Sequence, residues 1–203
     1  MNSPRLQYQK QFAKPQVVNI GCGEIPVDFG PETIQVDLDV YNHPNFVKAD
    51  AHNLPFQDDE FETAVLGDII EHSPDPVQML KEAGRVAKKV VATIYEEWRL
   101  DEAGKTNEEY LENMHKGLKE LGFDSHYDYL KSLPEHGKTI MSVTPDDPKR
   151  PHHPHLQMFK DDDIFKMVDD AGLEMLIYKK FQEGQLDGKF TYNWLVVARK
   201  KIV

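Results

Sequence analysis

Short apolar runs, each stopped by glycine, proline or acidic residues, recur along the first half of the chain. Runs of about four to eight apolar residues between turn signals are typical of buried β-strands. The pattern predicts five strands, at residues 17–20, 33–38, 46–49, 61–66 and 90–95. Two later runs, 174–181 and 192–198, predict a closing antiparallel pair.

Helix signals lie between the fourth and fifth of these strands and again before the last two. Asp75 suits an N-cap, Pro76 the first helical position, and Gln78 completes a capping-box spacing. One face of this helix then carries Val77, Leu80, Gly84 and Ala87. A second helix is predicted over 161–171 and ends before Gly172 as C-cap. Its inward residues are expected to be Ile164, Phe165, Val168 and Ala171.

Alternating strands and helices predict an α/β fold with a mostly parallel sheet and an antiparallel last strand. The connections after Gly23 and Asp39 are too short for full crossover helices, so the early crossovers are expected to be loops. The amino-terminal segment, to Gln16, is expected to cover the edge that they leave open. From about 96 to 159 the chain is polar and rich in proline, and we interpret this stretch as a helical insertion within a single domain, 1–203.

Composition narrows the class of protein. The chain of 203 residues has 39% hydrophobic and 29% charged residues, which is typical of a globular domain. A net charge of −11 argues against non-specific nucleic-acid binding. No apolar run approaches the roughly 20 residues of a membrane span, and the amino terminus lacks a signal-peptide core. The single cysteine, Cys22, excludes an internal disulfide, so a cytoplasmic location is expected.

The residues that could bind a ligand follow the ends of the predicted parallel strands. Ligands of such sheets bind beyond the strands' carboxyl ends. The glycines of Gly21-Cys22-Gly23 allow a sharp turn close to a ligand. Asp37, at the end of the second strand, can accept hydrogen bonds from ribose hydroxyls, or can be a simple turn residue. Asp50 can accept from an exocyclic amine, with Leu54-Pro55-Phe56 as an apolar wall for a purine.

Acids and imidazoles follow the fourth strand in Gly67-Asp68-Ile69-Ile70-Glu71-His72. Together with the glycine turn, Asp37, Asp50-Ala51 and the segment Leu54-Pro55-Phe56, this order resembles the class I methyltransferases. The resemblance is to the small methyltransferase-domain group with LPF and EHxxDP signatures, and it covers about residues 16–95. The usual third glycine of the first loop is missing, because Glu24-Ile25-Pro26 follows Gly23.

The resemblance implies S-adenosylmethionine as cofactor and a Rossmann-like methyltransferase sheet. It implies that Gly21 and Gly23 line the methionine part and that Gly67-Asp68 flank the sulfonium. Asp37 would bind the ribose and Asp50-Ala51 the adenine. The full set of expected cofactor residues is Gly21, Cys22, Gly23, Asp37, Leu38, Asp50, Ala51, Gly67 and Asp68. Within this set Cys22 is interpreted as a packing residue of the loop and not as a nucleophile.

The expected reaction moves a methyl group to an O, N or C atom of a small-molecule acceptor, held beneath residues 96–159. Positioning and exclusion of water are the main requirements, and an oxygen acceptor also needs a general base. The candidate catalytic residues are Glu71, His72 and His155, although His72 also suits a structural role at the helix start.

Three alternatives stay open at this point. A divalent metal at Asp68, Glu71 and His72 or at 152–155 is less favoured than a polar pocket rim, so no metal is expected. The chain can also be a non-catalytic cofactor-binding module, because the third glycine is missing, or a nucleotide-using oxidoreductase. Sequence leaves the oligomeric state open, as monomer or homodimer.

Overall fold

A computed structural model describes residues 3–95, 116, 119–122, 159, 161–186 and 189–201. Contacts divide the chain into two units, one of residues 1–71, 75–96 and 159–203 and the other of residues 72–74 and 97–158. Nearly all of the second unit lies outside the described residues, and so does the expected insertion over 96–159. The insertion therefore stays a prediction, and the account below concerns the first unit.

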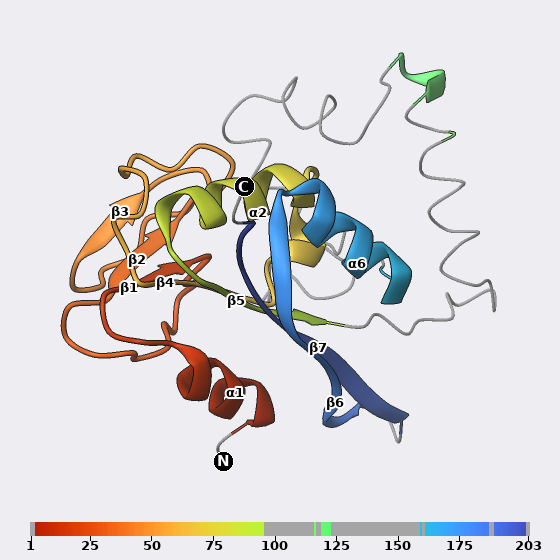
Figure 1. The fold of residues 1–203 in the computed structure, drawn as a ribbon, viewed down its shortest axis with the longest axis horizontal. Helices are drawn as coiled ribbons and strands as arrows, with labels where there is room; N and C mark the ends of the chain where they lie inside the picture. The colour runs from red at the N-terminus through yellow and green to blue at the C-terminus, as the bar shows by residue number, and fades with distance from the viewer. Residues whose placement is uncertain are drawn as a thin grey trace. The chain divides into compact units, whose positions relative to one another are not determined.

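Seven strands form one mixed sheet in the described part of the chain (Figure 1). Its spatial order is β3-β2-β1-β4-β5-β7-β6. The strands are β1 (Val17–Ile20), β2 (Ile34–Asp37), β3 (Phe46–Lys48), β4 (Thr63–Gly67), β5 (Val90–Tyr95), β6 (Leu173–Leu186) and β7 (Lys189–Lys200). The pairings among β1 to β5 are parallel, whereas β7 runs antiparallel to β5 and to β6. This confirms the predicted fold class.

The central strands are apolar because both faces of the sheet are covered. Every residue of β1 is buried, and so are the first four of β4 and the first five of β5. Four-residue apolar runs without alternation are expected for such doubly covered parallel strands. The fourth strand begins at Thr63, later than predicted, and Phe61 makes an isolated bridge to Ala87.

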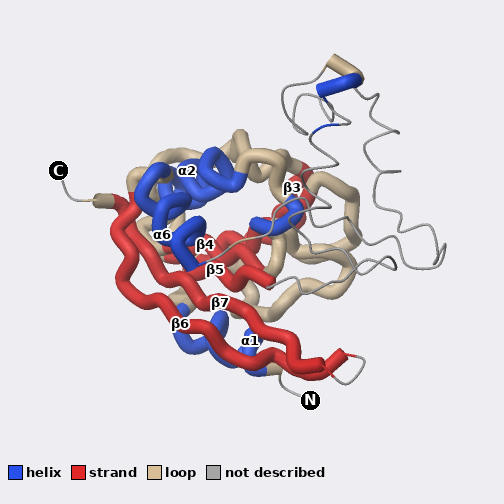
Figure 2. The backbone as a smooth tube through the Cα atoms, turned by 90° about the vertical axis from the view of Figure 1, so that its right-hand side faces the viewer, coloured by secondary structure: helices blue, strands red, loops and turns tan. Residues whose placement is uncertain are grey.

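Helices cover the two faces of the sheet, with α2 (Pro76–Val86) and α6 (Asp161–Asp170) on one side and α1 (Pro4–Phe12) on the other (Figures 1 and 2). The short 3-10 helix η1 (Ile70–His72) precedes α2. The larger core packs beneath α2 and α6 and includes Ile20, Leu66, Leu80, Ile94, Ile164 and Trp194. The smaller core lies on the other face and includes Val17, Val65, Val91, Phe181, Leu195 and Val197, with Tyr8 and Phe12 of α1 against it.

The start of α2 follows the capping rule. The Asp75 carboxylate accepts a hydrogen bond from the Gln78 amide at 2.9 Å, and Pro76 begins the helix. The Gln78 side chain reaches the His52 carbonyl at 3.1 Å, so the start of α2 is bonded to the loop after β3. Leu80 and Gly84 are buried as expected, whereas Val77 is half-buried.

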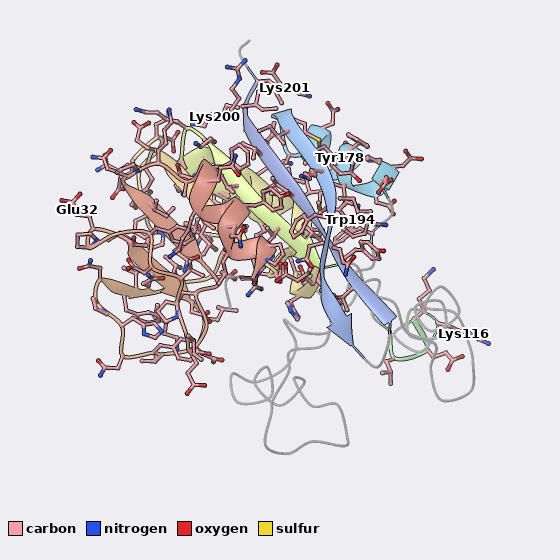
Figure 3. All side chains as sticks on the ribbon, turned by 90° about the horizontal axis from the view of Figure 1, so that it is seen from below. Glu32, Lys116, Tyr178, Trp194, Lys200 and Lys201 are labelled. Carbon is pink, nitrogen blue, oxygen red and sulfur yellow. The ribbon has the colours of Figure 1, made fainter. Side chains whose placement is uncertain are left out.

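The predicted inward face of α6 is wrong at one position. Phe165 is 46% exposed and packs on Tyr178 with ring centroids 4.6 Å apart, whereas Met167 is buried at 4%. The buried set Ile164, Met167 and Val168 follows the i, i+3, i+4 helical spacing, which leaves position 165 at the edge of the face. Asp161 fixes the start of α6 by accepting from Tyr178 Oη at 2.6 Å and from Trp194 Nε1 at 2.9 Å (Figure 3).

The early crossovers are short loops, as predicted. Residues 21–33 between β1 and β2, and 38–45 between β2 and β3, contain no helix. The sequence did not predict α1 as a helix, although Ser3 caps it and Pro4 begins it. In the described residues, no helix has the length and apolar character that a membrane crossing requires.

Candidate functional site

The glycine turn lies at the carboxyl end of β1 and is bonded to the neighbouring strand. The amides of Gly21 and Cys22 both donate to the Val36 carbonyl, at 2.8 and 3.0 Å. Gly21 and Gly23 have φ of +71° and +63°, in the left-handed region that favours glycine. The backbone therefore reverses sharply beside the end of β2.

The two glycines differ in what surrounds them. A Cβ added at Gly21 would lie 2.0 Å from Ile69 Cδ1, so the Ile69 side chain occupies this space. A Cβ at Gly23 would have no atom of the described chain within 4 Å. Gly21 is thus required by packing, whereas the side of Gly23 that lacks a Cβ faces open space where a ligand can approach the backbone.

Asp37 joins the glycine turn to the end of β2. Its carboxylate accepts from the Gly23 amide at 2.9 Å and from the Asp39 amide at 3.1 Å, one on each oxygen. An ionised carboxylate has about four acceptor sites, so two remain for further donors. Asp37 is half-buried, and it therefore fits a pair of ligand hydroxyls without leaving its backbone partners.

Asp50 reaches the same edge from β3. The Ala49 amide donates to the Asp37 carbonyl at 3.0 Å, which places the following residue beside the end of β2. The Asp50 carboxylate bonds the His52 amide at 2.9 Å and the His52 ring Nδ1 at 2.6 Å, and its side chain is 50% exposed. Ala51 is buried. The turn, Asp37 and Asp50 thus lie at one edge, with open space at Gly23 and a half-exposed acid at position 50.

The loop after Asp50 is held by a pair of charged residues on α2. The Arg85 guanidinium donates to the carbonyls of Leu54 and Phe56 at 2.9 and 2.8 Å. Glu82 accepts from the Leu54 amide at 2.8 Å and from Arg85 Nε at 2.7 Å. Leu54 is buried in the core at 3%, so of the predicted apolar wall Leu54-Pro55-Phe56 only Pro55 and Phe56 keep exposed surface. Arg85 thereby lowers the pKa of Glu82.

Comparison with known proteins finds a matching family model and a curated relative. The protein family described as "Methyltransferase domain" matches residues 11–92. A ubiquinone/menaquinone biosynthesis C-methyltransferase of Rickettsia massiliae is 29% identical over 160 residues, which is 73% of this chain. The chain spans about half, 54%, of the length of that relative.

Two solved structures share the fold at low identity. An S-adenosylmethionine-dependent methyltransferase from Methanosarcina mazei has a TM-score of 0.54 at 13% identity, covering 95% of this chain and 96% of its own. The Burkholderia thailandensis 1,6-didemethyltoxoflavin-N1-methyltransferase, with bound 1,6-didemethyltoxoflavin and S-adenosylhomocysteine, has a TM-score of 0.58 at 12% identity. It covers 99% of this chain and 80% of its own.

The chain thus has the class I methyltransferase fold, and its residues 11–92 match the methyltransferase domain. The matched domain and the relative agree with the predicted enzyme class and methyl donor, an S-adenosylmethionine-dependent methyltransferase. The roles of individual residues stay predictions.

Cys22 is buried at 7% within the glycine turn. Burial, and then the nearby Asp37 carboxylate, raise the pKa of its thiol to about 12. A thiol that stays protonated is a poor nucleophile, which agrees with the interpretation of Cys22 as a packing residue. Leu38, by contrast, is 61% exposed beside Asp37.

Gly67 ends β4 and Asp68 follows it, at a polar network that the sequence did not predict. A Cβ at Gly67 would lie 2.7 Å from Gln9 Nε2, so this glycine makes room for α1. The Asp68 carboxylate forms an ion pair with Arg5. It also accepts from Thr93 Oγ1 and from Asn193 Nδ2, both at 2.8 Å.

The structure describes two of the three candidate catalytic residues, Glu71 and His72. Glu71 is fully buried, and its Oε1 accepts from the Tyr95 amide at 3.1 Å. Burial, and then the charge of Asp68, raise the pKa of Glu71 well above its ordinary value. His72 is half-buried at the end of η1, and His155 lies outside the described residues.

Two functional candidates were missed by sequence reasoning. Arg5 pairs with Asp68 across 63 positions of sequence, and no local pattern signals that contact. His43 Nε2 lies 2.8 Å from the Gly23 carbonyl and stacks on Tyr41 at a centroid distance of 5.5 Å. The sequence signal that could have identified His43 is its position with Tyr41 in the loop that follows the strand-end acid Asp37.

Proposed function

We propose that this methyltransferase binds S-adenosylmethionine at the edge formed by Gly21–Gly23, Asp37 and Asp50. It then transfers the methyl group to an O, N or C atom of a small-molecule acceptor. The observation that carries the proposal is the direct bonding of three strand ends: the Gly23 amide to the Asp37 carboxylate, and the Ala49 amide to the Asp37 carbonyl. Parallel strands present their carboxyl ends at one edge, where ligands of this architecture bind.

Each residue has a role that its surroundings allow. Asp37 offers its two remaining acceptor sites to ribose hydroxyls, and the half-exposed Asp50 accepts from the adenine amine. Gly23 leaves its backbone open to the methionine part, and exposed Leu38 and buried Ala51 flank the two acids. When bound, the cofactor supplies a methyl carbon on a positively charged sulfonium. The chain's contribution is to hold the acceptor in line with that carbon and to exclude water.

The acceptor is proposed to be a small molecule because of what the comparisons name. The Rickettsia relative is named for ubiquinone/menaquinone biosynthesis, and the Burkholderia structure for 1,6-didemethyltoxoflavin. We propose residues 96–159 as the cover of the acceptor and Glu71, His72 and His155 as candidate proton acceptors. Burial raises the pKa of Glu71, so its carboxylate, once ionised, is a stronger base than that of an ordinary glutamate.

Calorimetry on the full chain tests the cofactor site. The parent is expected to bind S-adenosylmethionine and S-adenosylhomocysteine but not NAD. Asp37→Ala is expected to weaken both by about tenfold to a hundredfold, the value of hydrogen bonds to a charged group. Glu32→Ala is the matched control, because Glu32 is exposed just before β2, at the end remote from Asp37 (Figure 3). Its affinities should equal those of the parent.

Two results would contradict the proposal. If Asp37→Ala binds as tightly as the parent, the ribose assignment is wrong. If the parent binds neither compound at high micromolar concentration, the cofactor site itself is wrong. If the chain binds the cofactor but releases no S-adenosylhomocysteine with any acceptor of a broad panel, the alternative of a non-catalytic binding module is favoured instead.

A further inference from the structure

The Asp68 cluster is a network of side chains at the carboxyl ends of β4 and β5, defined here as Arg5, Gln9, Asp68, Thr93 and Asn193. Gln9 Nε2 donates to Thr93 Oγ1 at 2.9 Å, and Thr93 Oγ1 donates to Asp68 at 2.8 Å. Asn193 and the Arg5 guanidinium also donate to the Asp68 carboxylate. Arg5 of α1 thus bonds the Asp68 carboxylate directly, and Gln9 of α1 is linked to it through Thr93.

The cluster is incompletely bonded. Among the described residues, four buried side-chain polar atoms have no hydrogen-bond partner: Arg5 Nε, Gln9 Oε1, Asn193 Oδ1 and Glu71 Oε2. The first three belong to the cluster, and the charge of Asp68 acts on the fourth. Buried polar groups are nearly always paired, and leaving one unpaired is unfavourable. The three atoms within the cluster leave one donor and two acceptors that a ligand or a rearranged side chain can pair.

The cluster lies at the point where the strand order of the sheet reverses. β1 and β4 are neighbours, with Ile20 opposite Leu66, so the glycine turn and Gly67-Asp68 leave the sheet side by side. Ile69, next to Asp68, fills the space beside Gly21. In open α/β sheets this reversal point is where ligands bind. Asp68 is therefore a carboxylate at the expected ligand position, and a cation from α1 is paired with it.

Arg5 can release its side chain while α1 stays docked. The Arg5 backbone amide donates to Glu183 Oε2 at 2.9 Å, and Ser3 Oγ bonds the other oxygen of the same carboxylate. Lys179 Nζ bonds Tyr8 Oη at 2.5 Å and lies 4.8 Å from the centre of its ring. These contacts hold the helix independently of the guanidinium, and the Arg5 side chain as a whole is 32% exposed.

We propose that Arg5 occupies, in the free protein, the position on Asp68 that the sulfonium of the donor takes when it binds. This inference rests on the proposed function and adds a specificity-determining residue to it. S-adenosylmethionine carries the sulfonium charge, whereas S-adenosylhomocysteine has a neutral sulfur and gains nothing from Asp68 at that atom. Because two cations on one carboxylate repel each other, Arg5 must give way to the donor but not to the product. Arg5 thus sets the relative affinity for donor and product.

Titration calorimetry with both compounds tests this exchange on the full chain. Arg5→Gln is expected to bind S-adenosylmethionine about fivefold more tightly than the parent, the factor that corresponds to a partly exposed ion pair. Its affinity for S-adenosylhomocysteine should stay within about twofold. Arg5→Lys keeps the cation and should behave like the parent. Lys10→Gln is the matched control, because it removes one exposed positive charge from α1 at its other end, and it should change neither affinity.

The proposal is overturned if Arg5→Gln changes the two affinities by the same factor, changes neither, or weakens the donor. A general loosening of α1 acts on both compounds alike, so the ratio separates the specific effect from a structural one. If Arg5→Gln does not fold, as judged by circular dichroism, Arg5→Met takes its place and keeps the apolar stem of the side chain. If the parent binds neither compound, that result refutes the proposed cofactor site itself and not the exchange at Asp68.

Discussion

The two glycines of the turn after β1 should respond very differently to alanine. Both have positive φ, which costs a residue with a Cβ about 1–2 kcal/mol. Only at Gly21 does the new Cβ meet the described chain, 2.0 Å from Ile69 Cδ1, and overpacking of this kind costs about 1–3 kcal/mol more. Gly21→Ala should therefore lower the free energy of unfolding by roughly 2–5 kcal/mol and Gly23→Ala by roughly 1–2 kcal/mol.

Urea unfolding followed by circular dichroism measures these losses. The clash itself is isolated by a double-mutant cycle with Ile69→Ala, in which the two changes should offset each other by about 1–3 kcal/mol. Calorimetry completes the contrast, because Gly23→Ala is expected to lose cofactor affinity while remaining folded. Equal losses of stability at the two glycines, or a coupling near zero between positions 21 and 69, would refute the division into a packing glycine and a ligand-facing glycine.

Three further outcomes follow from the charges and thiol of the first unit. Burial raises the pKa of the Cys22 thiol to about 12, so a thiol-reactive disulfide reagent at about pH 8 should leave native protein unmodified and react fully after unfolding. Folding raises the pKa of Glu71, so the folded state keeps a proton that the unfolded chain loses, and stability falls as pH rises above the unfolded value of about 4.3. Glu71→Gln should remove that fall, which urea unfolding at several pH values measures. Parallel profiles of the free energy of unfolding against pH in parent and variant would contradict this. Arg85 lowers the pKa of Glu82, so this pair stabilises the parent above about pH 4.3, and that stabilisation is lost on acidification. The free energy of unfolding of Glu82→Gln should therefore fall less steeply on acidification than that of the parent. An equally steep fall in parent and variant would count against the pairing.

Much of the sheet could be predicted because its signals are local. A buried parallel strand such as β5 is a mostly apolar run of consecutive residues. The spacing of Asp75, Pro76 and Gln78 predicts the start of α2. The strand-end positions of Asp37 and Asp50 follow from the same runs, since parallel strands end at one edge. The sequence therefore predicted which residues gather there before any distance was known.

The remaining features depend on contacts between distant positions. The only buried residue of α1 in the described chain is Gln9, and no apolar periodicity marks the helix. Its docking depends on Arg5 reaching Asp68 and on Ser3 reaching Glu183, partners that lie far away in sequence. Phe165 was misplaced because an apolar side chain at the edge of a helical face can pack outside the core, here on Tyr178.

The central claim is that the glycine turn and two strand-end acids hold one adenosine. Diffraction from crystals grown with S-adenosylhomocysteine measures this most directly. The expected result is density for a single nucleoside at the carboxyl ends of β1, β2 and β3, with its ribose hydroxyls on Asp37 and its adenine amine on Asp50. Nucleoside density elsewhere on the molecule, or a ribose that touches neither acid, would contradict it.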